Sequence, residues 1–269
     1  MIEMEYTGNL SKMITESGNP IRYFLKLGEN NIFMNDLIGK IIDLKFDGTI
    51  HCVACGREIK KAFGQGFCYP CFMNSPLNSA CILKPELCLA HVGKGRDPQW
   101  EEENHNQPHY VYLAQTSGIK VGVTRIDQVP TRWIDQGAWK AIKIALTPYR
   151  FLAGMIEVHL KKDIADKTPW QKMLKNETDN NLNLLDEKER IIERIDPEFH
   201  PYILKDENEI DIFEYPVIKY PETVKSINLD KSPNIHSKLT GIRGQYLIFD
   251  DDQVINLRKH SGFKILLSV

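Results

Sequence analysis

A pair of Cys-x-x-Cys motifs constrains the fold of this chain more than any other feature. The first motif is Cys52-Val-Ala-Cys55 and the second is Cys68-Tyr-Pro-Cys71, with twelve residues between them. Each motif can form a tight turn that presents two thiolates to one ion, and two such turns complete a tetrahedral site of four sulfur atoms. We therefore predict a structural zinc ion at these four cysteines. Four unrelated thiols, or redox chemistry at a single motif, would not explain why the motifs occur as a pair.

The expected cellular location also favours metal binding over disulfides. Residues 1–6 lack a basic stretch followed by an apolar one, and no apolar run approaches the ~20 residues needed to cross a membrane. The 42% of hydrophobic and 26% of charged residues match an ordinary globular protein. We therefore expect a cytoplasmic protein without a membrane partner. In that reducing compartment, cysteines serve as metal ligands more often than as disulfides.

A second group of potential ligands follows the paired motifs. Cys81, Cys88 and His91 supply three side chains that suit zinc, and either His105 or His109 could be the fourth ligand. The chain is thus expected to hold one or two structural zinc ions. The plain alternative is that both cysteines belong to the core and the histidines lie on a loop. Residues 92–108 are mostly polar and indicate a surface connector anchored by Trp100.

Downstream of the cysteines, two short β-rich segments indicate a hairpin. The segments are Tyr110–Ala114 and Ile119–Thr124, separated by a polar break that ends in glycine. A helical segment with Arg132 follows, and a second helix carries Glu157 within an apolar run. A tyrosine, a lysine, an arginine and a carboxylate on successive elements suit phosphodiester chemistry.

The order of these residues resembles the GIY-YIG superfamily of nucleases over about 50 residues. Tyr110-Val-Tyr112 and Lys120-Val-Gly122 match the two tripeptides that name the superfamily, and Arg132 and Glu157 follow in the same order. The longer arrangement, from the cysteine motifs to Ala-Gly-Met-Ile-Glu157, is similar to an uncharacterised bacterial family of unknown function. That family implies no activity.

The resemblance implies a role for each matched residue. Tyr112 would hold the attacking water, Arg132 would neutralise charge on the phosphate, and Glu157 would bind a catalytic Mg²⁺ or Mn²⁺ ion. Lys120 stands where the second tyrosine is expected and would activate water or contact phosphate, while Arg125 is a rival for the arginine position. The alternatives are an ordinary strand tyrosine, a solvated arginine and an exposed helix carboxylate.

Charge and the resemblance together suggest nucleic acid as the partner. Between residues 119 and 162 there are eight basic and three acidic residues, a local excess of five positive charges. The expected function is divalent-metal-dependent hydrolysis by an endonuclease. The alternative is a non-catalytic nucleic-acid-binding or assembly module. Chemistry on a small phosphorylated ligand is a third possibility, but no glycine-rich phosphate loop supports it. The oligomeric state is left open.

These patterns predict an α+β fold in four segments. Residues 1–50 are β-rich and turn at Asp47-Gly48, residues 51–108 form a zinc-ribbon-like segment, and residues 109–200 form a small antiparallel sheet with flanking helices. An amphipathic helix is expected at 183–195. Residues 201–269 contain a proline-rich linker and further strands, so both termini are expected to supply strands to one β-domain.

Overall fold

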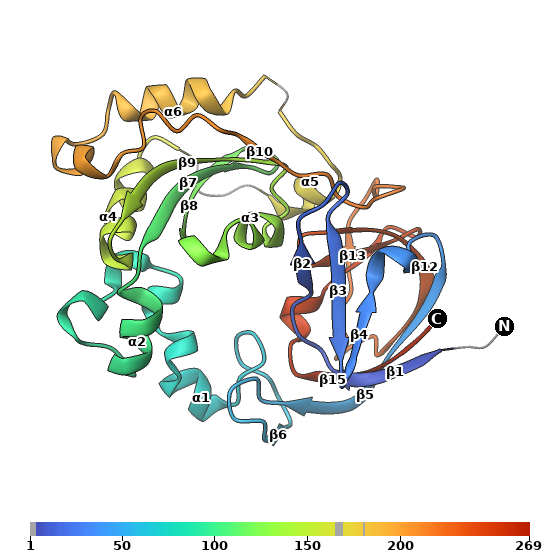
Figure 1. Cartoon of the computed structure of the whole chain (residues 1–269). Helices are drawn as coiled ribbons and strands as arrows, with labels where there is room; N and C mark the ends of the chain where they lie inside the picture. Colours follow the sequence, from blue (N-terminus) through green and yellow to red (C-terminus); the bar gives the residue numbers. More distant parts are fainter. Residues whose placement is uncertain (1–3, 165–168, 180) are drawn as a thin grey trace. The chain divides into compact units, whose positions relative to one another are not determined.

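A computed structural model describes residues 4–164, 169–179 and 181–269 (Figure 1). The chain divides into two compact units, of which the first combines Met1–Met73 with Glu214–Val269 and the second comprises Asn74–Phe213. Sheets and helices occur together, so the α+β class is confirmed.

The first unit is organised around a sheet to which both ends of the chain contribute. Its strand order is β1-β15-β5-β12-β13-β14-β11, with β6 also paired to β5. The strands are β1 (Glu5–Asn9), β5 (Ile41–His51), β6 (Glu58–Ile59), β11 (Lys225–Ser226), β12 (Asn234–Arg243), β13 (Tyr246–Phe249), β14 (Gln253–Asn256) and β15 (Phe263–Ser268). Because β1 and β15 pair directly, the prediction that both termini supply strands to one β-domain is confirmed.

A smaller sheet and two short helices complete the core of this unit. The sheet has the order β2-β3-β4, with β2 at Ile14–Glu16, β3 at Arg22–Leu27 and β4 at Asn30–Phe33. The 3-10 helices η1 (Met34–Leu37) and η8 (Leu257–His260) follow β4 and β14. Alternate residues of β3 are buried and exposed, as expected for a strand with one face in the core.

The predicted turn at Asp47-Gly48 is wrong, because β5 runs through these residues without reversing. Phe263 of β15 pairs with Ile50, whereas Ile265 pairs with Phe46, so the register shifts around Gly48. Gly48 has a φ of 92°, a conformation that glycine adopts without steric cost. The dipeptide therefore forms an irregularity within a long strand.

The second unit contains the predicted hairpin at the edge of a four-stranded sheet with the order β10-β9-β7-β8. The strands are β7 (His109–Gln115), β8 (Ile119–Arg125), β9 (Lys140–Thr147) and β10 (Asp211–Ile212). β7 and β8 pair antiparallel from His109↔Arg125 to Gln115↔Ile119, which confirms the hairpin.

Helices cover both faces of this sheet, as Figure 1 shows. Val111, Leu113 and Val121 pack with apolar residues of α4 (Arg150–Leu160) and α6 (Leu184–Ile192). The short helix α3 (Thr131–Asp135) contacts the other face through Trp133. The expected helices around Arg132, Glu157 and residues 183–195 are therefore present. The remaining elements here are η6 (Ile126–Gln128), α5 (Trp170–Leu174) and η7 (Pro197–Tyr202).

The segment between the cysteine motifs and the hairpin is built from two short α-helices and four 3-10 helices. α1 (Tyr69–Asn74) is followed by η2 (Pro76–Asn78), η3 (Ala80–Ile82), η4 (Pro85–Leu87), η5 (Ala90–Val92) and α2 (Pro98–His105). Within the expected connector at 92–108, residues Pro98–His105 form the helix α2, which the sequence analysis did not predict. Asp97 accepts a hydrogen bond from the Trp100 N–H and caps the helix, while Pro98 occupies its first turn.

No helix within the described ranges is long and apolar enough to cross a membrane.

Candidate functional site

The four cysteines of the paired motifs come together in the first unit. Their sulfur atoms all lie within 4.8 Å of one another. A tetrahedral zinc ion with Zn–S bonds of about 2.3 Å requires sulfur atoms about 3.8 Å apart. The Sγ atoms of Cys55 and Cys68 are separated by 3.8 Å. The chain thus has a group of four cysteines that could hold a metal ion.

The backbone around these cysteines is arranged to stabilise thiolates. Burial alone would raise the pKa of Cys52, but backbone N–H groups of Cys68, Cys55 and Ala54 donate to its sulfur and lower the pKa to about 6. The guanidinium of Arg57 donates to the Cys55 sulfur at 3.1 Å. Hydrogen bonding with Cys68, together with burial and the other sulfur atoms, raises the pKa of Cys71 to about 12. Four clustered thiols cannot all ionise unless a cation offsets their repulsion.

The second unit holds another group of four potential ligands, all buried: Cys81, Cys88, Glu101 and His105. The Cys81 sulfur lies 3.6 Å from Nδ1 of His105 and 4.0 Å from Oε2 of Glu101. Ser79 adds a hydroxyl 3.2 Å from the same sulfur. The cysteines come from η3 and the end of η4, while the carboxylate and imidazole come from one face of α2 at i,i+4 spacing.

The charges in this second group are strongly coupled. A hydrogen bond with Cys88 lowers the pKa of Cys81 to about 4 against the effect of burial, with help from His105 and Ser79. The same interaction raises the pKa of Cys88. Burial and the neighbouring Cys81 sulfur also raise the pKa of Glu101, whereas His105 lowers it. When acidic groups share a buried site, ionisation of one raises the pKa of its neighbours unless a cation is present.

His91 and His109, two of the histidines considered as ligands, lie outside this group. The His91 ring stacks on Tyr149 and Phe151, with ring centroids 5.0 and 4.7 Å away. His109 is fully buried in β7, and its Nδ1 donates to the Gln107 carbonyl at 2.6 Å. Burial is the main cause that lowers the pKa of His109 to about 3. Of the sequence alternatives, only His105 joins Cys81 and Cys88.

Glu101 was missed because the helix that carries it was missed. The signal was present in Asp97-Pro98, a capping residue followed by a proline suited to the first turn of a helix. A helix beginning there places residues 101 and 105 on the same face. Glu101 and His105 would then have been recognised as a pair of ligands.

Tyr112 lies at the centre of a separate group of polar residues on the hairpin. It is fully buried and stands directly opposite Gly122 in β8. A Cβ atom at Gly122 would come within 2.5 Å of the Tyr112 Cζ, so the tyrosine ring occupies the space that the glycine leaves. Trp133 packs edge-on against the ring at 5.7 Å, and Gln136 donates to the hydroxyl.

Arg132 and Glu157 both act on the Tyr112 hydroxyl. Burial raises the pKa of Tyr112, the positive charge of Arg132 lowers it, and the negative charge of Glu157 raises it. Glu157 is only 6% exposed and forms an ion pair with Lys161 at 3.4 Å. We call Tyr112, Arg132 and Glu157 the Tyr112 cluster.

Lys120 and Arg150 flank the cluster. Lys120 pairs with Ala114, two residues along β8 from Gly122, so its side chain leaves the sheet on the same face as Tyr112. Arg150, which sequence reasoning did not select, interacts electrostatically with Arg132 and Glu157 and also with both cysteines of the second group. The structure thus brings three of the four predicted catalytic residues together and places the fourth on the same sheet face.

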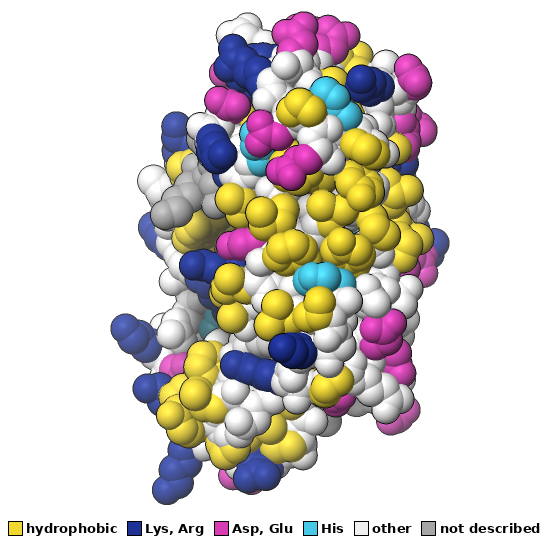
Figure 2. Space-filling model, turned by 90° about the vertical axis from the view of Figure 1, so that its left-hand side faces the viewer, with side chains coloured by type: hydrophobic (Ala, Val, Ile, Leu, Met, Phe, Trp, Pro, Cys, Tyr) yellow, Lys and Arg dark blue, Asp and Glu magenta, His cyan; other side chains and the backbone are white. Residues whose placement is uncertain are grey.

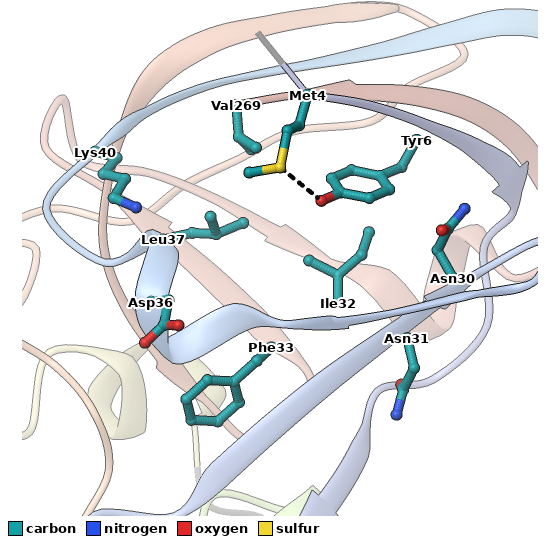
Figure 3. A pocket seen from close by; sticks show the side chains of 10 residues that line it. All are labelled: Met4, Tyr6, Asn30, Asn31, Ile32, Phe33, Asp36, Leu37, Lys40 and Val269. Atoms are coloured by element: carbon teal, nitrogen blue, oxygen red, sulfur yellow. Dashed lines mark hydrogen bonds between the residues drawn. The ribbon is translucent and has the colours of Figure 1, made fainter. Parts of the chain in front are cut away.

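A hollow of about 350 Å³ occurs in the first unit (Figure 3). Ile32, Leu37 and Val269 line it together with polar groups, and the Tyr6 hydroxyl contacts the Met4 sulfur at 3.3 Å. None of the predicted site residues lines this hollow.

Comparison with known proteins identifies a family but no activity. Residues 39–265 match the protein family described as "Protein of unknown function (DUF2797)". No curated protein and no solved structure matches the chain.

Proposed function

Because the chain belongs to the DUF2797 family, whose function is unknown, we propose an activity from its own residues: divalent-metal-dependent hydrolysis of a nucleic-acid phosphodiester at the Tyr112 cluster. The match over residues 39–265 spans both compact units, so the matched part of this chain contains the cysteine groups as well as the hairpin. The resemblance of the hairpin to the GIY-YIG superfamily is part of this proposal.

The observation that supports the proposal most is that the Tyr112 hydroxyl interacts electrostatically with both Arg132 and Glu157. Burial keeps the Tyr112 hydroxyl protonated at neutral pH, so it orients the attacking water and does not act as a base. Arg132 neutralises the negative charge that grows on the phosphate oxygens as water attacks. The phosphorus–oxygen bond to the leaving group breaks, and the water proton ends on the leaving oxygen.

Glu157 is the residue that would hold the catalytic cation, because carboxylate oxygens suit Mg²⁺ and Mn²⁺. Such an ion polarises the phosphate and stabilises the leaving oxygen. Lys120 contacts a neighbouring phosphate of the substrate, in keeping with the basic segment 119–162. The four cysteines of the paired motifs hold zinc in a structural role, since four thiolates leave no ligand position for a substrate.

The test is cleavage of labelled DNA and RNA, offered as single-stranded, double-stranded and branched substrates with Mg²⁺ or Mn²⁺. We expect wild type to cut at least one class of substrate. Tyr112→Phe and Arg132→Gln should reduce the cleavage rate, whereas Arg194→Gln, which changes an exposed arginine on the same unit, should not. Equal rates for all four proteins would refute the role of the cluster. Absence of cleavage on every substrate would refute the activity.

Burial of the cluster favours one alternative, a non-catalytic nucleic-acid-binding or assembly module. Tyr112 is completely buried and Glu157 nearly so, whereas a phosphodiester must reach both side chains. In this case Lys120 and Arg132 only bind phosphate. Binding would persist without Mg²⁺, weaken steeply with salt and occur without cleavage. Measuring affinity over a salt series, with and without EDTA, separates the two functions.

A further inference from the structure

We propose that Cys81, Cys88, Glu101 and His105 bind one divalent zinc-type cation, and that Arg150 is the counter-charge that joins this centre to helix α4. The inference goes beyond the hydrolytic function and does not depend on it. It names Glu101 as a metal ligand and Arg150 as a positioning residue.

The separation of two of the donor atoms matches a tetrahedral zinc-type ion. With bonds of about 2.3 Å to sulfur and about 2.0–2.1 Å to nitrogen, such an ion places these two donor atoms about 3.6 Å apart. The Cys81 sulfur and the His105 Nδ1 are 3.6 Å apart. Two thiolates, an imidazole and a carboxylate are ligands that zinc accepts, whereas calcium and magnesium select oxygen atoms.

The charges also fit a divalent ion. Two thiolates and one carboxylate carry three negative charges, and a divalent cation leaves one negative charge to be balanced in a buried place. The guanidinium of Arg150 supplies the balancing positive charge, because it interacts electrostatically with both cysteines. Its Nε and Nη2 hold it in place by donating to the Cys81 carbonyl at 3.1 and 2.9 Å. A second donation from Nη2 reaches the Ile82 carbonyl at 3.1 Å. A buried charge is retained when it is paired and hydrogen-bonded in this way.

The leucines in and beside the loop between the cysteines are largely exposed and contribute little buried apolar surface. Leu83, Leu87 and Leu89 are 85%, 51% and 49% exposed, while the two cysteines beside them are buried. Figure 2 faces the side on which Figure 1 draws α4 and these turns, and it shows hydrophobic side chains gathered on the surface. Among the described residues, the buried cluster at these cysteines consists of Cys81, Cys88 and Ala90, with Phe151 packed against it. Segments of this kind are typically folded by a bound metal.

The loop between Cys81 and Cys88 also packs against the beginning of α4. A Cβ atom at Gly154 would come within 2.8 Å of the Glu86 Cα, so the helix and the loop backbone touch. Phe151 packs on the buried cysteines, and Arg150 donates to the loop carbonyls. Glu157 lies two turns further along the same helix. Metal binding at the second group therefore fixes the helix that carries Glu157.

The first test counts metal ions by native mass spectrometry of the purified full chain. Wild type should carry two zinc ions, and Glu101→Ala or His105→Ala should carry one. Glu103→Ala, on the exposed side of α2, and His91→Ala should both retain two ions. One ion in wild type, or two ions in Glu101→Ala and His105→Ala, would overturn the proposal.

A second measurement uses wild type alone, so it does not depend on whether a variant folds. Cobalt substituted into wild type gives sulfur-to-metal charge-transfer absorption whose intensity follows the number of bound thiolates. Titration should reveal two cobalt ions, one with four thiolates and one with two. A single cobalt ion, or a second ion without thiolate absorption, would contradict the proposal.

The role of Arg150 is tested by competition with a chelator. We expect Arg150→Met to weaken binding of the second zinc ion at least tenfold and to accelerate hydrogen exchange along α4. Arg194→Met, a change of an exposed arginine, should leave both unchanged. Unchanged zinc affinity in Arg150→Met would show that Arg150 does not provide the counter-charge.

Discussion

At the scale of single residues, the contact between Tyr112 and Gly122 determines whether the Tyr112 cluster can form. Gly122 leaves room for the aromatic ring that crosses it on the sheet surface. The Tyr112 hydroxyl accepts a hydrogen bond from Gln136 and interacts electrostatically with Arg132 and Glu157. Glycine is required at position 122 because a larger side chain would collide with the Tyr112 ring. Its backbone conformation in β8 does not itself require glycine.

We predict that Gly122→Ala destabilises the protein by about 2 kcal/mol, because the added methyl group must displace a fully buried ring. Denaturant unfolding measures the loss. Tyr112→Leu shortens the obstructing side chain, so in the double variant the two effects should be less than additive by about 1 kcal/mol. If the losses of the two single variants add exactly in the double variant, the contact between residues 112 and 122 does not contribute to stability.

His109 makes a prediction about pH. Its pKa is lowered to about 3 in the folded chain, chiefly by burial, whereas an unfolded histidine has a pKa of about 6.5. The unfolded state therefore binds the proton more readily, and stability falls as pH drops below about 6.5. At pH 5, which is about 1.5 pH units below the unfolded pKa, the expected loss in the free energy of unfolding is about 2 kcal/mol.

The comparison that isolates His109 uses unfolding free energies at pH 7.5 and pH 5. His109→Gln should lose about 2 kcal/mol less on acidification than wild type does, since it cannot be protonated. His200→Gln, a change of an exposed histidine, should follow wild type. A His109→Gln variant with the wild-type pH dependence would show that another group is responsible.

At the scale of elements, α2 is the helix on which the second group of potential metal ligands depends. Its eight residues carry both Glu101 and His105, and few of its side chains are buried. A short helix of this kind depends on its cap because it gains little from packing.

We predict that Asp97→Ala costs about 1 kcal/mol, because the Trp100 N–H loses its acceptor. The variant should also release zinc from the second group more readily, since α2 presents two of the four ligands. Thermal unfolding and zinc release to a chelator measure both effects. Asp97→Ser retains an acceptor and should behave like wild type. If Asp97→Ala and Asp97→Ser cannot be distinguished, the cap does not support the centre.

Elements were predictable where local patterns agree with the tertiary environment. The hairpin and the helices around Arg132 and Glu157 follow from residue periodicity and turn composition alone. Asp47-Gly48 has the composition of a turn, but pairing of β5 with β15 on one side overrides that local preference. For the second group of potential ligands, the sequence indicated Cys81 and Cys88 and offered His105 as one of two alternatives, but His91 was chosen in error and Glu101 was missed. Side chains separated by a loop are brought together by folding and not by a fixed spacing.

At the scale of the whole molecule, each compact unit holds one group of potential metal ligands. The group of four cysteines lies in the first unit, and the group containing Glu101 lies in the second. The first unit is assembled from both ends of the chain through pairing of β1, β15 and β5. Such pairing joins residues more than 200 positions apart, which is why the sequence suggested the common sheet but could not order its strands.

The rate of phosphodiester cleavage by Glu157→Gln, relative to wild type, tests the central claim most directly. Both proteins are compared with Mn²⁺ present and with equal zinc content, so that only the Glu157 carboxylate differs. We predict a loss of at least about 100-fold, because the carboxylate proposed to bind the cation becomes a neutral amide. Glu189→Gln, a change of an exposed carboxylate on α6, should cleave like wild type. Equal cleavage by wild type and Glu157→Gln would contradict the account.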